Sequence, residues 1–221
     1  MVRTENRMSS DDTWRGLLIA NVVTAAFAIY FHWTLADLLW PYWIQSVIIG
    51  WFSRKRILAL KGFDVAGVRF NDKPVTETPD TKRNIANFFA LHYGIFHLVY
   101  LFFLLTRHRG GDWRFWLPIL GAGVAFAVQQ SLSYRQTIDA ITAGRPNIGT
   151  MMALPYLRIV PMHAAILSGV ALTDTLNLAA LALFTLLKTV ADIGMQVVAH
   201  RWLMTARPAR PSLPRQARDR L

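Results

Sequence analysis

The chain has 221 residues, of which 53% are hydrophobic and 12% aromatic, and its formal net charge is +11. It contains no cysteine, which excludes disulfides, thiolate metal sites and cysteine nucleophiles. The apolar residues run in blocks of about 15 to 23 instead of alternating, which excludes a strand-based barrel and indicates an all-α integral membrane protein.

Six apolar blocks predict a bundle of about six transmembrane helices. In chain order we expect crossings near 17–33, 36–53, 85–106, 115–134, 159–173 and 176–199. The predicted domains are a cytoplasmic N-terminal segment (1–16), the six-helix domain (17–202) and a disordered basic tail (203–221).

The largest predicted soluble piece is the loop 54–84, which contains GFDVAGVRFNDKPVTETPD. Its glycine, proline and aspartate residues predict turns and favour a short β-hairpin. Thr81 is the expected N-cap of the third helix.

Lysine and arginine are distributed unevenly over the predicted links. Twenty of the 24 lie in the N-terminal segment, the second and fourth links and the tail, whereas three lie in the third link. The positive-inside rule therefore predicts a multi-pass membrane protein with both termini and the loop 54–84 in the cytoplasm. The positive rim would face anionic lipids, so no nucleic-acid partner is needed to explain the charge. The sequence does not decide whether the protein forms a homo-oligomer.

Charged residues also occur inside the last apolar block. In LLKTVADIG (186–194), Lys188 and Asp192 are four residues apart, so they share a helix face and can act as a charge pair or a proton relay. An ionisable group at the centre of a membrane helix costs about 2.5–3.5 kcal/mol on insertion scales, so it normally has a partner and indicates a functional site. We expect Asp192 to meet His92 or His163 as well.

His92, His163 and Asp192 are the candidate metal ligands. Two imidazoles and one carboxylate suit zinc or a similar divalent ion, and the same trio could relay protons in a small transporter. His92 and His97 are about 140° apart around a helix, so they cannot ligate one ion together. A secondary polar cluster consists of Gln45, His97, Gln130 and Arg158.

Purely structural roles and other functions are alternatives to these hypotheses. The pair Lys188–Asp192 could be a structural bridge, and each histidine could make an interhelical hydrogen bond worth about 0.6–2 kcal/mol. A haem protein with His92 and His163 as axial ligands is another alternative, as is a partner-binding protein without site chemistry. The sequence has no nucleophile elbow, HExxH or phosphate loop and offers no catalytic residue, so binding or transport is favoured over an enzyme.

Two stretches of the second half carry a family resemblance: PYLRIVPMHAAILSGVAL (155–172) and LLKTVADIGMQVVAHRW (186–202). They resemble an uncharacterised family of bacterial inner-membrane proteins, a domain of unknown function, over roughly residues 38–202. The family motifs P-Y-x-R-[IV]-V-x-x-H and K-T-x-x-D correspond here to Pro155, Tyr156, Arg158, Ile159, Val160 and His163, then Lys188, Thr189 and Asp192. Relatives often have a histidine where this chain has Gln130, so a metal site that used that histidine would be lost or altered here. The resemblance implies a multi-pass protein of the bacterial inner membrane without naming a reaction.

Overall fold

The structure is a computed structural model that describes residues 29–30, 34–107, 113–167 and 178–205. Its elements in chain order are α2 (Leu35–Ala59), β1 (Arg69–Phe70), β2 (Lys73–Pro74), α3 (Pro79–Arg107), α4 (Trp113–Ala143), α5 (Ile148–Ala153), the 3₁₀ helix η1 (Leu154–Arg158), α6 (Ile159–Leu167) and α7 (Leu178–Thr205). The described part is therefore mostly helical, as predicted. The predicted crossing 17–33 and the predicted terminal segments fall almost entirely outside the described residues.

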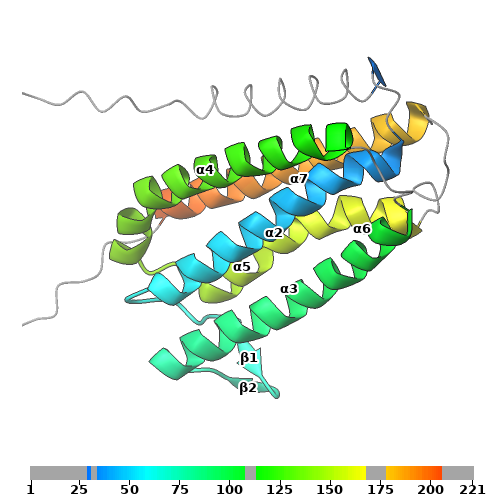
Figure 1. The fold of residues 1–221 in the computed structure, drawn as a ribbon. Coiled ribbons are helices and arrows are strands. Elements are labelled where there is room, and N and C mark those ends of the chain that lie inside the picture. Colours follow the sequence, from blue (N-terminus) through cyan, green and yellow to red (C-terminus); the bar gives the residue numbers. More distant parts are fainter. Residues whose placement is uncertain (1–28, 31–33, 108–112, 168–177, 206–221) are drawn as a thin grey trace, which may run out of the picture.

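The helices lie side by side, with α2 between α3 and α4 (Figure 1). Helix α5 and η1 lie against α2, and α7 packs against η1 and α6. This arrangement places α2, η1 and α7 around one common interior, which is where the candidate site described below lies.

Three described segments are long and apolar enough to cross a membrane: Pro79–Arg107, Phe115–Ala143 and Ile148–Leu167. The predicted crossings 36–53 and 176–199 correspond to α2 and α7, which are not among these three. The outer faces of α3 and α4 carry exposed apolar side chains, including Leu91, Leu98, Phe102, Leu117 and Val124. Such continuous apolar faces are unusual on a soluble monomer, whereas lipid tails accommodate them. The described helices are therefore compatible with a membrane protein.

Several helices extend beyond the apolar blocks from which they were predicted. Helix α2 continues to Ala59 instead of residue 53, and α4 continues to Ala143 instead of 134. Charged residues can continue a helix outside the apolar layer, because backbone hydrogen bonds define the helix while the apolar block reports only lipid depth.

The N-terminus of α3 lies six residues before its predicted start. Pro79 takes the first helical position, which suits a residue without an N–H, and the Oγ1 of Thr78 accepts the backbone N–H of Thr81 at 3.1 Å. Thr78 is therefore the N-cap, and the prediction for Thr81 was wrong by three residues.

The described part of the predicted fifth crossing, 159–173, is α6, and two helical segments that were not predicted, α5 and η1, precede it within the predicted fourth link. Pro155 stands at the start of η1, and Pro161 lies inside α6. Because proline has no N–H to donate, it interrupts the regular α-helical ladder. The short 3₁₀ segment ends at Arg158. The sequence predicts this arginine in the fourth link, at the cytoplasmic surface. In the structure Arg158 is buried, with 3% of its surface exposed.

The loop after α2 is folded against the link between α4 and α5. Strands β1 and β2 pair in an antiparallel hairpin, as predicted, with Asn71 and Asp72 at positive φ in its turn. The backbone N–H of Asp64 donates to the Pro146 carbonyl at 2.9 Å, and the N–H of Ile148 donates to the Asp64 carbonyl at 3.0 Å. The second and fourth links therefore lie at the same end of the bundle.

Candidate functional site

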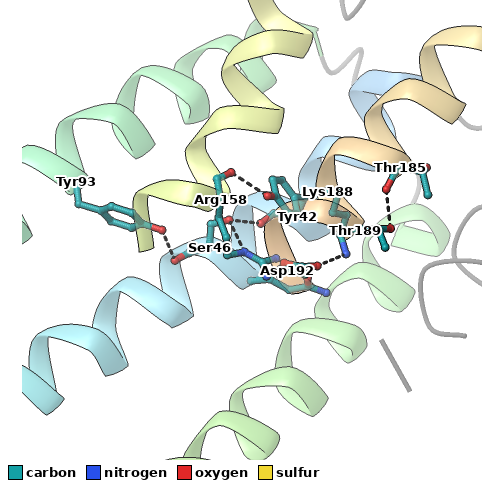
Figure 2. A network of polar contacts seen from close by, with 9 residues as sticks. Tyr42, Ser46, Tyr93, Arg158, Thr185, Lys188, Thr189 and Asp192 are labelled. Carbon is teal, nitrogen blue, oxygen red and sulfur yellow. Dashed lines mark hydrogen bonds and ion pairs between the residues drawn. The ribbon is translucent and has the colours of Figure 1, made fainter. Parts of the chain in front are cut away.

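A cluster of three charged side chains lies where η1 and α7 meet (Figure 2). Nη1 of Arg158 bonds Oδ1 of Asp192, and Nζ of Lys188 donates to Oδ2 of the same carboxylate at 3.0 Å. The side chains of Arg158 and Asp192 are only 4% and 5% exposed. Each carboxylate oxygen is thus held by a different cation. We refer to Arg158, Lys188 and Asp192 as the charge cluster.

Helix α2 supplies the polar groups that complete the surroundings of Arg158. Nη2 donates to Oε1 of Gln45 at 3.1 Å, and Nε donates to Oγ of Ser46 at 3.5 Å. The hydroxyl of Tyr42 donates to the backbone carbonyl of Arg158 at 2.8 Å. The ring of Tyr42 also lies 4.7 Å from the guanidinium carbon and 5.6 Å from Nζ of Lys188, so it offers both cations its negative face.

The second partner of Asp192 is Arg158, in place of either histidine expected from the sequence. Lys188 and Asp192 do form the pair four residues apart. The sequence alone predicts Arg158 as a member of the secondary polar cluster and as a charge of the fourth link. The local signal that could have identified it is its position inside the apolar stretch LPYLRIVP, between Pro155 and Pro161.

Each candidate metal-ligating histidine pairs with a tyrosine at the contact between α3 and the η1–α6 segment. Nδ1 of His92 and the hydroxyl of Tyr156 are 2.8 Å apart, and Nδ1 of His163 and the hydroxyl of Tyr100 are 3.0 Å apart. Because His92 and Tyr100 are eight residues apart on α3, about 12 Å along a helix, the two pairs lie at different levels.

The predicted trio His92, His163 and Asp192 does not come together as a ligand set. Among the described residues, no three His, Asp or Glu side chains form a group that could hold a metal ion. Asp192 is instead engaged by two cations, and the ring of Phe96 contacts both imidazoles, with centroid distances of 5.2 and 6.2 Å. Metal or haem binding by the histidines stays a prediction from the sequence.

His97 occupies the other face of α3 and is buried, whereas His92 is exposed. Its Nδ1 donates to the carbonyl of Tyr93 at 2.9 Å, and its ring stacks on the Tyr93 ring with a centroid distance of 4.3 Å. The indole N–H of Trp43 donates to the His97 carbonyl at 2.9 Å. The 140° separation of the two histidines therefore places them in different environments.

Tyr93 connects His97 to the surroundings of the charge cluster. Its hydroxyl donates to the carbonyl of Ser46 at 3.1 Å, as Figure 2 shows. The ring lies so close to α2 that a Cβ at Gly50 would be 2.6 Å from the Tyr93 Cε1 atom. Only glycine therefore allows α2 and α3 to approach each other at this level.

Of the predicted secondary cluster, Gln45 and Arg158 share the site and His97 lies beside it. Gln130 lies on α4, half-buried, and none of the contacts described above includes it.

The family model described as Family of unknown function (DUF6498) matches residues 3–209. The chain belongs to this family. No curated protein and no solved structure matches the chain.

The DUF6498 match includes the whole charge cluster and extends beyond the roughly 38–202 of the resemblance noted in the sequence. It confirms membership of a family of unknown function, which by itself indicates no chemistry. Arginine keeps its charge in proteins, so proton exchange within the cluster falls to Asp192 and Lys188. Adding a proton to Asp192 would remove the negative charge that Arg158 and Lys188 share.

Proposed function

We propose that this protein is a multi-pass carrier of the bacterial inner membrane that couples proton movement to the transport of a small solute. Asp192 is the proton-binding group, and Arg158 and Lys188 respond to its charge. The observation that carries the proposal is the buried carboxylate shared by two cations from η1 and α7.

The energetics of buried charge support a functional role over a purely stabilising one. Removing two ions from water costs several kcal/mol per ion, and well-packed apolar residues of similar volume often stabilise a protein as well or better. Ionisable residues inside membrane helices commonly belong to ion pathways and proton relays. A site with three charges is therefore better explained by a change in charge during function.

The broken helix beside the cluster supports a carrier in particular. Arg158 ends the 3₁₀ segment between α5 and α6, within the candidate span Ile148–Leu167. In many transporters the coupling sites are formed by discontinuous helices, where irregular backbone lines a cavity. A change in the pairing of Arg158 with Asp192 would act directly on this segment and on α7.

The six-crossing topology with both termini inside belongs to the same proposal. It is supported by the uneven distribution of lysine and arginine and by the contact of the second link with the fourth, through Asp64 and Pro146. The carrier would expose its basic links and tail to anionic lipids at the cytoplasmic surface.

The test measures charge displacement by the full-length chain reconstituted on a solid-supported membrane and exposed to rapid pH jumps. Wild type should give a transient current that Asp192→Asn abolishes, because the proton then has no carboxylate to bind. Asp80→Asn is the matched control, since Asp80 is an exposed acid in the first turn of α3. It should keep the wild-type current.

A structural brace is the competing role, favoured by the bonds that tie Arg158 to α2 as well as to α7. If the cluster is only a brace, Asp192→Asn lowers stability but leaves the current per folded molecule at the wild-type level. That result would overturn the carrier proposal. Size-exclusion chromatography and helical circular dichroism give the folded fraction for each variant.

A further inference from the structure

One ring nitrogen of His97 makes a hydrogen bond, and the other has no partner in the part of the chain that the structure describes. The Tyr93 carbonyl can only accept, so Nδ1 of His97 must carry the proton that it donates there. In the neutral imidazole the lone pair is therefore on Nε2. This atom is buried and has no hydrogen-bond partner among the described residues. A buried acceptor without a donor is unfavourable and rare in native structures, so it calls for an explanation.

The groups around His97 decide when Nε2 can accept a proton. Helix α3 itself contributes Tyr93 and Tyr100, and α2 contributes Trp43, none of which carries a charge. The η1 segment contributes Arg158, whose charge acts on His97. The positive charges of Arg158 and Lys188 are partly offset in turn by Asp192. His97 is thereby coupled electrostatically to the carboxylate of the charge cluster.

This coupling has a definite sign. While Asp192 is ionised, it offsets part of the positive charge of Arg158 and Lys188, so an imidazolium at His97 meets less repulsion. Once Asp192 takes up a proton, Arg158 is left unbalanced and repels an imidazolium at His97. Proton binding at the two sites is therefore mutually unfavourable, as expected for two positions that are occupied in turn.

We propose that Nε2 of His97 is the second proton-binding atom of the transport cycle, alternating with Asp192; this inference rests on the proposed function. In one half of the cycle the O–H bond of the Asp192 carboxyl breaks, and the proton passes to water and leaves a carboxylate. The lone pair of Nε2 then takes up a proton from water to give an imidazolium, while the Nδ1–H stays on the Tyr93 carbonyl. When Nε2 gives this proton back to water, the ring is neutral again and Asp192 can bind the next proton.

Two variants separate the two ring nitrogens. His97→Asn places an amide N–H where Nδ1 was, so it can keep the bond to the Tyr93 carbonyl, but it has no group at the position of Nε2. His97→Gln places its amide nearer the position of Nε2 and gives up the Nδ1 donor. A structural role that needs only the bond to Tyr93 survives in His97→Asn, whereas a proton-binding role does not.

The experiment records displaced charge against pH for the reconstituted full-length chain. Two groups that titrate in turn should give wild type two steps. Asp192→Asn should lose one step, and His97→Asn should lose the other while keeping the one that depends on Asp192. If His97→Asn retains both steps, the role of His97 is overturned and the carrier proposal stands. If the currents do not depend on Asp192, the carrier proposal itself fails.

A second measurement covers the case in which His97→Asn does not fold. ¹⁵N-histidine NMR of wild type in liposomes follows all six histidines, and His97 is recognised by an Nδ1 that stays protonated throughout the titration. We expect its Nε2 to gain a proton over the pH range of the second current step, and this midpoint to shift in Asp192→Asn. An Nε2 that stays unprotonated across that range would overturn the inference.

Discussion

Arg158 and Asp192, 34 residues apart in the chain, form an ion pair whose side chains are almost completely buried. The pair joins the end of the 3₁₀ helix to α7, and Lys188 occupies the second oxygen of the carboxylate. Because both ions are out of water, removing one leaves the other without its main compensation. Single substitutions at this pair should therefore have larger effects than substitutions at surface pairs.

The first prediction concerns the stability of this pair. Arg158→Met should lower the free energy of unfolding by about 3–5 kcal/mol, because Asp192 remains buried with one fewer cation and Gln45 loses a donor. The thermal midpoint in detergent, followed by intrinsic tryptophan fluorescence, measures the loss. The triple variant Arg158→Met, Lys188→Met, Asp192→Leu should recover most of it, since neither the carboxylate nor either cation is then left unpaired.

The chain offers a matched control for this substitution. Arg145 pairs with Glu77, but these side chains are 49% and 32% exposed. Arg145→Met should therefore cost less than about 1 kcal/mol, the usual range for a solvated pair. Equal losses for Arg145→Met and Arg158→Met would contradict the importance that we attach to burial.

The second prediction concerns the close approach of α2 and α3. Gly50→Ala should destabilise the protein by about 1–3 kcal/mol, because the new methyl group would overlap the buried Tyr93 ring and displace its hydroxyl from the Ser46 carbonyl. Gly94→Ala is the control, since a Cβ there meets no atom within 4 Å. It should be neutral or stabilising by up to about 1 kcal/mol through helix propensity. The reverse order of stabilities would refute the packing described here.

The third prediction concerns pH and the docking of the loop at Asp64. The backbone N–H of Ala66 and the side-chain amide of Asn147 donate to the Asp64 carboxylate and hold its pKa below the usual aspartate value of about 3.9. The charged form is thus favoured in the folded state. This contribution to stability is present above pH of about 3.9 and is lost as the pH falls through the lower folded pKa.

Hydrogen exchange at the Ile148 amide, which bonds the Asp64 carbonyl, reports this docking. After correction for the intrinsic exchange rate, its protection should fall from pH 6 to pH 3 in wild type. Asp64→Asn should show weaker protection at pH 6 and little further change on acidification. A wild-type protection that does not depend on pH would show that the carboxylate contributes nothing to the docking.

The fourth prediction concerns metal and haem. We expect the zinc and iron contents of purified protein, and its visible spectrum, to be the same for wild type and His163→Ala. The reason is that His163 and His92 are hydrogen-bonded to Tyr100 and Tyr156, while Asp192 is engaged by cations. Near-stoichiometric metal or haem that disappears in His163→Ala would instead restore the ligand set predicted from the sequence.

The two histidines of α3 show what the sequence could predict about the site. A spacing of five residues is enough to place His92 and His97 on different helix faces, and the structure has one exposed and the other buried. Periodicity could not show that His92 would face Tyr156 of η1, or that Tyr100 would face His163 of α6. Those pairings depend on how η1 and α6 lie against α3, which is a relation between segments distant in the chain.

The sequence by itself determined the helical class, the apolar blocks, the hairpin in the loop after α2 and the spacing that lets Lys188 reach Asp192. These features are local, since they follow from backbone hydrogen bonds and from residues within a few positions of one another. Only the tertiary structure decided that Arg158 leaves the rim, enters the interior and takes the first oxygen of Asp192. A charge is assigned to rim or interior by the packing of whole segments, because burial is tolerated only where a distant residue supplies the compensating charge.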